Sequence, residues 1–508
     1  MSETLIESKA AGKAEGKPAG QATARTTSAA VIAGRGTLYI TLAKAWFMIT
    51  GYAIHFSLPR LISAEQFGLY QVVIGVVSIV NAVLITGTSQ TVSKFVSQEP
   101  EKAGSIKTAA LRTQVVVGAA VSLGFFLLAP VMADRLNDSR LSSYFRLAAA
   151  IPLFYSFYAV FTGYFNGRKQ FLKQASIDMT YSTLKAAFIV SLAWLGYGVW
   201  GGVGGFVLAA GAILLIASIA ARDSGGGQQF HVRGLFAFQF YLLASTLIMN
   251  LLQKTDLILV KAVSASDPVM AATNAGYYGA AVNVANITFQ LIVSITFVIF
   301  PLVSEATFNR DVETTKVYVA NTLRAVLIIM ALVATLFSAN SRSVLVLLYP
   351  RDYQEASQAL AILAFGALLF GLFYVTTTIV TASGKPLVSL AFGSGALVAN
   401  AAFNLFLIPR YGLSGAAAGV VASMLLGVLG SLIYLGWNYG RILPVPSLIR
   451  LAICAGVVYG ASLGFTPSSR LLIIAKLAAL GVLFLILLLI TREIKKSDIA
   501  AMKGIVRI

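Results

Sequence analysis

Residues 197–201 read Tyr-Gly-Val-Trp-Gly, and residues 411–415 read Tyr-Gly-Leu-Ser-Gly. Each copy continues to a further glycine, at Gly205 and at Gly419, and the offset between the copies, from 197 to 411, is 214 residues. A tyrosine followed by a glycine is common where loops meet helices, so one such pair carries little weight. The repeated spacing of the two glycines is what suggests a duplicated unit.

Two further pairs of motifs occur at nearly the same offset and in the same order. Residues 68–70 (Gly-Leu-Tyr) are echoed by residues 276–278 (Gly-Tyr-Tyr), and residues 167–168 (Gly-Arg) by residues 384–385 (Gly-Lys). Three matches along one chain predict two homologous halves. In a helical membrane protein, such a duplication is typical of secondary transporters.

Composition places the chain in a membrane. Of its 508 residues 58% are hydrophobic and 11% are charged, with a mean hydropathy of +0.82. Soluble domains average about 25% charged residues. Apolar runs of the roughly 20 residues that cross a bilayer recur along the chain, about fourteen in all. They lie near 37–57, 69–90, 110–132, 144–165, 176–196, 199–221, 237–261, 277–301, 319–340, 357–381, 387–409, 414–436, 449–465 and 471–491.

These runs predict an all-α integral membrane protein with about 14 transmembrane helices. Six spans fall in each half, so both halves have the same orientation and are related by a pseudo-twofold axis along the membrane normal. Two C-terminal helices follow the repeat. The expected segments are a disordered tail (1–34), an N-lobe (35–221), an interlobe linker (222–236), a C-lobe (237–436), two additional helices (437–491) and a cytoplasmic tail (492–508).

The net charge of +19 is a topology signal and not a nucleic-acid signal. With the N-terminus in the cytoplasm, 25 of the 38 lysines and arginines lie in inner segments, 10 in outer segments and 3 within spans. Such a bias predicts that both termini are cytoplasmic.

The three lysines within spans are the first candidates for a binding site. They are Lys44, Lys185 and Lys254. A charge in hydrocarbon costs about 2.5–3.5 kcal/mol on insertion scales, so it usually faces a cavity or a partner. The alternative is that each lysine snorkels to the interface or neutralises a neighbouring carboxylate. Asp178, Tyr181 and Lys185 are expected on one helical face.

Amides form a second set of candidates. Asn283, Asn286, Gln290 and Ser294 follow one face of a helix, and Asn81 occupies nearly the position equivalent to Gln290 in the other half. Such amides could bind sugar hydroxyls in a cavity, or they could join helices by hydrogen bonds. Asn400 and Asn404, four residues apart, could with Asp256 supply hard oxygen ligands for a small cation, and helix–helix hydrogen bonding is the alternative.

Catalytic motifs are missing from the sequence. It has no G-x-x-x-x-G-K-[ST] loop, so intrinsic ATP hydrolysis is excluded. The single cysteine, Cys454, cannot form a disulfide within the chain, and His55 and His231 are too far apart in the sequence to suggest a metal site. We therefore expect neither an enzyme nor a resident cofactor.

Several segments resemble the polysaccharide-export branch of the multidrug/oligosaccharidyl-lipid/polysaccharide (MOP) exporter superfamily. The resemblance covers about 35–436. Its segments are 58–70 (LPRLISAEQFGLY), 163–171 (GYFNGRKQF), 274–278 (NAGYY) with Ala280 and Ala281, 300–304 (FPLVS), 347–350 (LLYP) before Tyr353, and 404–417 (NLFLIPRYGLSGAA).

The resemblance implies a V-shaped, two-lobed transporter in the bacterial cytoplasmic (inner) membrane. It would move undecaprenyl-diphosphate-linked oligosaccharides between leaflets by alternating access, with a cationic cavity for the diphosphate. Polysaccharide polymerase and chain-length proteins are the implied partners, together with membrane lipids. Lys44, Lys185 and Lys254 would supply the cations.

The related peptidoglycan-precursor flippases differ in instructive ways. They carry arginines in the early spans and a sodium site with two polar residues four apart, a spacing that Asn400 and Asn404 share. The second ligand there is usually a carboxylate, whereas this chain has Asn404, so coupling to Na⁺ or H⁺ is an open expectation. Fourteen spans match this branch, while many oligosaccharide flippases have twelve. The competing functions are peptidoglycan-precursor flipping, a non-transporting scaffold of a polysaccharide assembly complex, and drug/cation antiport.

Overall fold

The computed structural model describes residues 19–222, 240–440, 442, 445–465, 467 and 469–494. The expected interlobe linker beyond Arg222 and most of the C-terminal tail lie outside the described residues. Within the described part the chain is helical throughout, with no strand. This confirms the all-α membrane fold.

The first half, which we call the N-lobe, comprises the helices up to α7. They are α1 (Ala19–Leu61), α2 (Ala64–Gln98), η2 (Pro100–Lys102), α3 (Ala103–Arg135), α4 (Arg140–Ala148), α5 (Ala150–Gly167), α6 (Phe171–Leu192), η3 (Ala193–Tyr197) and α7 (Gly198–Ala220). Because α1 begins at Ala19, residues 19–34 are helical, and the disordered tail expected up to residue 34 is wrong over that stretch.

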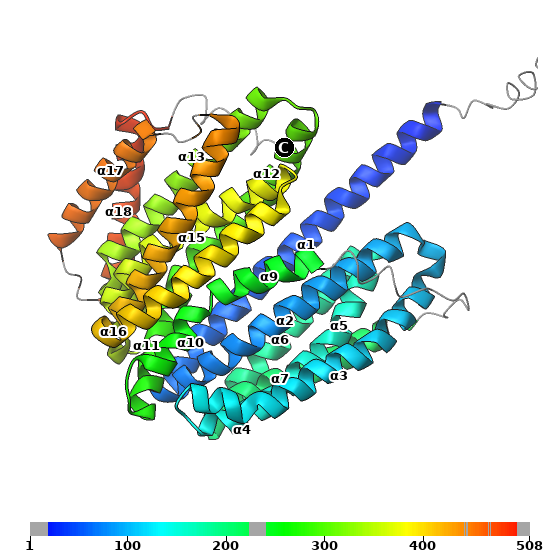
Figure 1. Cartoon of the computed structure of the whole chain (residues 1–508), viewed down its shortest axis with the longest axis horizontal. Helices are drawn as coiled ribbons and strands as arrows, with labels where there is room; N and C mark the ends of the chain where they lie inside the picture. Colours follow the sequence, from blue (N-terminus) through cyan, green and yellow to red (C-terminus); the bar gives the residue numbers. More distant parts are fainter. Residues whose placement is uncertain are drawn as a thin grey trace, which may run out of the picture.

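The second half, the C-lobe, extends to α16. Its helices are α9 (Phe240–Leu252), α10 (Thr255–Val263), α11 (Pro268–Ala285), α12 (Ile287–Phe308), α13 (Val312–Ala339), α14 (Ser341–Leu348), η4 (Arg351–Ala356), α15 (Ser357–Ala382) and α16 (Pro386–Tyr439). Two further helices, α17 (Val445–Leu463) and α18 (Arg470–Ile490), lie on the outside of this lobe (Figure 1).

Nine helices in the described part are long and apolar enough to cross a membrane, or ten if the bent pair α9–α10 is one span. Two of the nine, Phe171–Ala220 and Pro386–Tyr439, are 50 and 54 residues long. At about 1.5 Å per residue, each could cross a hydrocarbon core of about 30 Å twice. The expected total of fourteen remains a prediction.

The repeated Tyr-Gly motifs form the same turn in both lobes. Gly198 and Gly412 have φ of +52° and +56°, left-handed values that suit glycine. The next glycine of each motif then lets the returning helix touch the backbone of the preceding one. A Cβ on Gly201 would lie 2.8 Å from the Leu192 carbonyl carbon, and one on Gly415 would lie 2.2 Å from the Leu407 oxygen. The offset of 214 residues therefore marks equivalent helical hairpins.

The repeated Gly-x-Tyr motifs meet each other where the lobes cross. A Cβ on Gly68 of α2 would lie 1.8 Å from the Ala272 oxygen of α11, and one on Gly276 would lie 2.1 Å from the Ala64 oxygen. The contact is reciprocal, as a pseudo-twofold relation requires. From this crossing, which we call the glycine crossing, the helices of the two lobes diverge (Figure 1).

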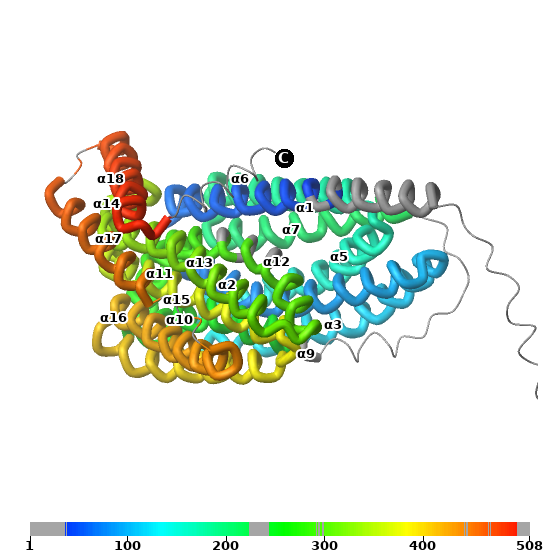
Figure 2. Tube along the Cα trace, turned by 90° about the horizontal axis from the view of Figure 1, so that it is seen from above, coloured from blue at the N-terminus to red at the C-terminus, as the bar shows by residue number. Residues whose placement is uncertain are grey.

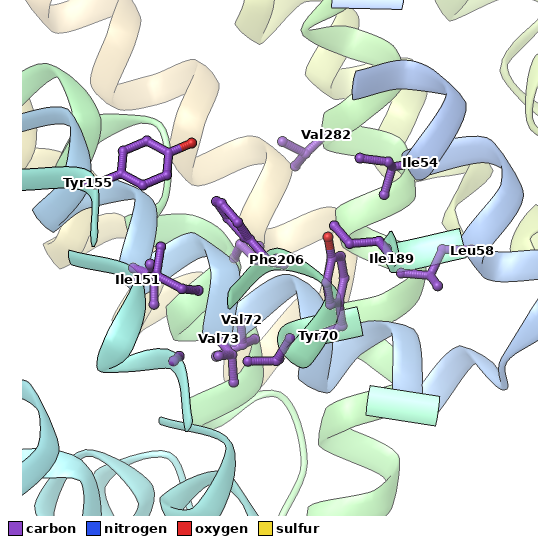
Figure 3. Packing of buried hydrophobic residues seen from close by; sticks show 14 of the residues in the cluster. Ile54, Leu58, Tyr70, Val72, Val73, Ile151, Tyr155, Ile189, Phe206 and Val282 are labelled. Carbon is purple, nitrogen blue, oxygen red and sulfur yellow. The ribbon is translucent and has the colours of Figure 1, made fainter. Parts of the chain in front are cut away.

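Long α1 belongs to the N-lobe by its packing. It lies alongside α6 (Figure 2). Ile54 and Leu58 of α1 gather with Ile189 of α6 and Tyr70 of α2 in the buried cluster of Figure 3. Burial of these side chains holds the C-terminal half of α1 against the other helices of the N-lobe.

A buried carboxylate fastens the two C-terminal helices to the C-lobe. Glu493, just after α18, is fully buried and accepts hydrogen bonds from Arg324 Nε of α13 at 2.8 Å and from Ser447 Oγ of α17 at 2.6 Å. Arg450 of α17 adds an ion pair at 3.1 Å. Burial alone would raise the pKa of Glu493, but these hydrogen bonds outweigh it and hold the pKa below its usual value. The three helices therefore stay joined at neutral pH.

Candidate functional site

Lys185 lies in an aromatic cage within the N-lobe. Its Nζ is 4.5 Å from the centroid of the Phe47 ring of α1, 5.4 Å from that of Phe206 of α7 and 5.5 Å from that of Tyr181 of α6. The faces of aromatic rings attract a cation electrostatically. Three helices thus hold this ammonium group in place without neutralising its charge.

The expected face with Asp178, Tyr181 and Lys185 is present on α6, and tyrosines of α5 support it. Tyr158 donates a hydrogen bond to Asp178 Oδ1 at 2.5 Å, and the hydroxyls of Tyr155 and Tyr181 are hydrogen-bonded. Lys44 of α1 is exposed and acts electrostatically on Asp178. The charge of Lys44 therefore acts on a carboxylate of α6, and its role in binding a substrate stays a prediction.

Lys254 lies at a break in its span. The seventh predicted span is not one straight helix, because α9 ends at Leu252 and α10 begins at Thr255 with a bend of 47°. Lys254 occupies the N-cap position of α10, and its aliphatic chain lies over Gly75 of α2, where a Cβ would be 3.8 Å from its Cδ. The break brings this lysine of the C-lobe against a helix of the N-lobe.

His55 connects these groups. The charges of Lys254 and Lys185 both act on its imidazole, and its Nδ1 lies 3.3 Å from Asn283 Nδ2 of α11. We call His55, Lys185, Lys254 and Asn283 the junction cluster, since it draws on both lobes. The sequence prediction missed His55. Its spacing was a usable signal, because eleven residues after Lys44 is three helical turns on the same face of α1.

The amides predicted on one helical face are divided between two places. The chain turns at Asn286, where α11 ends and α12 begins, so Asn283 and Gln290 do not share an uninterrupted helix. Asn283 faces His55, whereas Asn286 lines a cavity with Asp256, and Gln290 is exposed. Asn81 is buried in α2 and makes no hydrogen bond through Oδ1 within the described chain.

Asp256 has a partner that the sequence did not suggest. Tyr278, from the repeated Gly-x-Tyr motif, donates a hydrogen bond to its Oδ2 at 2.8 Å. Asp256 is only 4% exposed, and its Oδ1 has no hydrogen-bond partner among the described residues. The carboxylate and Gln253 line a cavity between α10, α11, α15 and α16.

Asn400 and Asn404 are both fully buried in α16, the helix against which α10 packs. Asn404 Nδ2 donates to the carbonyl and side-chain oxygens of Asn400, each at 2.8 Å. In the described part of the chain, Asn404 Oδ1 has no hydrogen-bond partner. The helix packing brings the two asparagines and Asp256 onto neighbouring helices.

A second group of charges joins the lobes near the glycine crossing. Lys261 of α10 is fully buried, and its Nζ lies 3.2 Å from Asp138 Oδ2, in the turn between α3 and α4. Arg140 pairs with Asp138 at 2.8 Å and with Glu65 of α2 at 2.5 Å. Asn137 adds a hydrogen bond to the Ala262 oxygen at 3.1 Å. The sequence prediction counted Lys261 and Arg140 among the ten outer lysines and arginines and did not pair them with the carboxylates.

Comparison with known proteins agrees with this arrangement. A profile of the family described as "Polysaccharide biosynthesis protein" matches residues 57–358. An uncharacterised membrane protein of Bacillus subtilis (strain 168), YabM, is 22% identical over 416 residues, which is 77% of each chain.

Two solved structures are similar in fold. The lipid II flippase MurJ in an inward closed conformation superposes with a TM-score of 0.70 at 12% identity, covering 90% of this chain and 99% of MurJ. An inward-facing MATE multidrug transporter of the MOP superfamily gives 0.63 at 14% identity, with 78% and 96% covered. At these identities the similarity extends to the fold alone.

Proposed function

Because the chain belongs to the family of polysaccharide biosynthesis proteins within the MOP exporter superfamily, we propose that it flips an undecaprenyl-diphosphate-linked oligosaccharide from the cytoplasmic to the outer leaflet. Its place would be the bacterial inner membrane with both termini in the cytoplasm. The product would pass to polysaccharide polymerase and chain-length proteins. Alternating access of the two lobes would carry the substrate, with no chemical step.

The junction cluster is the observation that carries this proposal. The charges of Lys185 from one lobe and Lys254 from the other both act on His55, and three aromatic rings surround the ammonium group of Lys185. Ammonium groups at membrane depth are costly unless an anion compensates them. A diphosphate would supply that anion, and binding by both lobes would couple its release to their separation.

A coupling cation would bind in the C-lobe. Asp256 Oδ1 and Asn404 Oδ1 are buried oxygens without hydrogen-bond partners in the described part of the chain, and Asn400 lies beside Asn404. Carboxylate and amide oxygens suit a small hard cation, so these residues fit Na⁺, and Asp256 alone fits a proton. Binding of the ion would lower the free energy of one state of the C-lobe, inward-facing or outward-facing, relative to the other.

Replacing Lys44 or Lys254 with alanine tests the diphosphate role. Each variant should insert normally, because removing a charge from a span eases insertion. Each should lower leaflet transfer of a fluorescent polyprenyl-diphosphate sugar in reconstituted vesicles by about tenfold or more, since a charge-assisted hydrogen bond contributes roughly 1.5–3 kcal/mol. Arginine should be tolerated better than alanine. Lys316→Ala, a surface lysine paired with Glu313, is the control.

Normal polysaccharide display in both alanine variants would rule out the diphosphate role. The remaining functions separate by experiment. A scaffold would give no leaflet transfer in vesicles. Rescue of a strain depleted of its peptidoglycan-precursor flippase would favour lipid II as the substrate, the molecule named for MurJ.

Asp256→Asn tests ion coupling. The substitution keeps the size of the side chain and the hydrogen bond with Tyr278, and it removes the charge that a cation or proton needs. We expect transport to lose its response to an imposed Na⁺ or H⁺ gradient while thermal stability is retained. Transport by this variant that follows the ion gradient as the parent does would contradict the coupling role.

A further inference from the structure

A groove follows the seam between α1 and α6 on the outside of the N-lobe. One cavity of about 400 Å³ lies at the start of α6, and a second of about 300 Å³ lies further along. Tyr39 of α1 and Leu172 of α6 line both, so the two cavities adjoin. Figure 2 shows α1 and α6 side by side along this stretch.

The second cavity is apolar and open to the outside. Leu42, Trp46 and Ile49 of α1 line it and are 54%, 38% and 56% exposed. Ala175 and Met179 supply the opposite wall from α6. Such exposed apolar side chains in a membrane protein face the acyl chains of lipid.

The first cavity is basic. Lys169 and Lys173, both exposed, line it, and none of the described residues in its lining is acidic. Lys169 has φ of +58°, so a left-handed turn places it just before α6. Gly36 closes the floor, because its position lies against the Phe171 ring with no room for a Cβ. By the loop charges, this is the cytoplasmic end of the bundle.

We propose that this seam binds an anionic phospholipid of the cytoplasmic leaflet, with its phosphate at Lys169 and Lys173 and an acyl chain along the apolar wall. Charge complementarity selects the headgroup, because basic residues at the membrane surface attract anionic lipid. The length of the groove also fits an acyl chain that reaches the middle of the bilayer. Trp46 Nε1 donates a hydrogen bond to Thr183 at 2.9 Å, and Thr183 lies ten residues after Lys173. Ten helical residues rise about 15 Å, half of a hydrocarbon core of about 30 Å.

Trp46 is a built-in probe of the groove. The chain has four tryptophans, and Trp194→Phe, Trp200→Phe and Trp437→Phe leave Trp46 alone. In vesicles, its fluorescence should be quenched more strongly by phosphatidylglycerol brominated on its acyl chains than by brominated phosphatidylcholine. For two lysines we expect a preference of about fivefold to thirtyfold, which falls with salt.

The lysines are tested by substitution. Lys169→Gln with Lys173→Gln should bring the preference close to one while leaving thermal unfolding unchanged, because both side chains are exposed. Lys385→Gln, at the equivalent motif of the C-lobe, should keep the parent's preference. Equal quenching by the two brominated lipids in the parent would overturn the proposal, as would a preference that survives the double substitution. Quenching that only a polyprenyl diphosphate relieves would also overturn it, because the occupant would then be the transported substrate. Quenching that depends only on the density of protein in the vesicles would overturn it too, because the occupant would then be a second copy of the chain.

Discussion

Replacing Gly276 with valine is expected to abolish transport and to open the glycine crossing. A Cβ at this position would lie 2.1 Å from the Ala64 oxygen, and the reciprocal Gly68→Val change would place a Cβ 1.8 Å from the Ala272 oxygen. Both obstacles are backbone atoms, which cannot rotate away as a side chain can. The lobes can accept the added carbon only by separating.

The cost falls on one state of the transport cycle. Overpacking costs typically about 1–3 kcal/mol and more against backbone, so the closed crossing should lose about 30-fold to 150-fold in population at 2–3 kcal/mol. Ala272, fully buried at the crossing, provides the measurement. In a Cys454→Ala background, cysteine at position 272 should resist a membrane-impermeant maleimide in the parent and react in the valine variants.

Gly395→Val is the matched control for a helical glycine, because a Cβ there meets nothing within 4 Å. It should leave both transport and labelling unchanged. If Gly276→Val transports normally with position 272 still protected, the tight contact is not needed to close this end of the molecule.

The two homologous halves could be predicted from the sequence, and the glycine crossing and the helix breaks could not. Repeated glycines mark positions where the backbone is left-handed or where another backbone approaches closely. Gly198 and Gly412 are of the first kind, and Gly68 and Gly276 are of the second. The turns at Lys254 and Asn286 have no glycine or proline to mark them. Lys254 packs against the other lobe, and Asn286 lines a cavity within its own lobe. The periodicity of an apolar run reports neither environment.

The candidate site residues could be found from their charge within apolar runs, but the residues that they contact could not be predicted. Lys185 and Lys254 stand out because ammonium groups are rare in apolar runs, but the rings around Lys185 come from three helices. His55 was set aside because it lacked metal-ligand spacing. The pairing of Asp256 with Tyr278 spans 22 residues and a helix boundary. Such pairs follow from tertiary packing, so a single sequence shows the charges without showing what they touch.

Replacing Asp138 with leucine is expected to release the lobes at the glycine crossing. It would leave Lys261, which is fully buried, with the carbonyl oxygens of Leu136 and Pro268 as its hydrogen-bond partners in the described part of the chain, at 3.2 and 3.4 Å. Removing one partner of a buried ion pair costs about 3–5 kcal/mol, so the closed crossing should lose more than about 100-fold in population. Reaction of cysteine at position 272 with maleimide, and loss of transport, would report the opening.

A double substitution separates the charge from the contact. Lys261→Met added to Asp138→Leu replaces the pair with apolar side chains, an exchange that is often neutral or stabilising. Protection of position 272 should return. Glu65→Gln is the control, because the pair of Glu65 and Arg140 is partly exposed and should contribute about 0–1 kcal/mol. A double variant as open as Asp138→Leu alone would show that the crossing depends on Asp138 itself and not on balancing Lys261.

The same pair predicts how closure responds to pH. Burial alone would raise the pKa of Asp138, but hydrogen bonds from Arg140 and Lys261 outweigh it and hold the pKa below its usual value. A lowered carboxylate pKa stabilises the closed form above the unpaired value of about 3.9, and that stability is lost only as the pH falls through the lowered pKa. Protection of position 272 should therefore be constant between about pH 5 and 8. Protection that fell steadily across that range would assign closure to a group that titrates near neutrality, because Asp138 stays ionised throughout it.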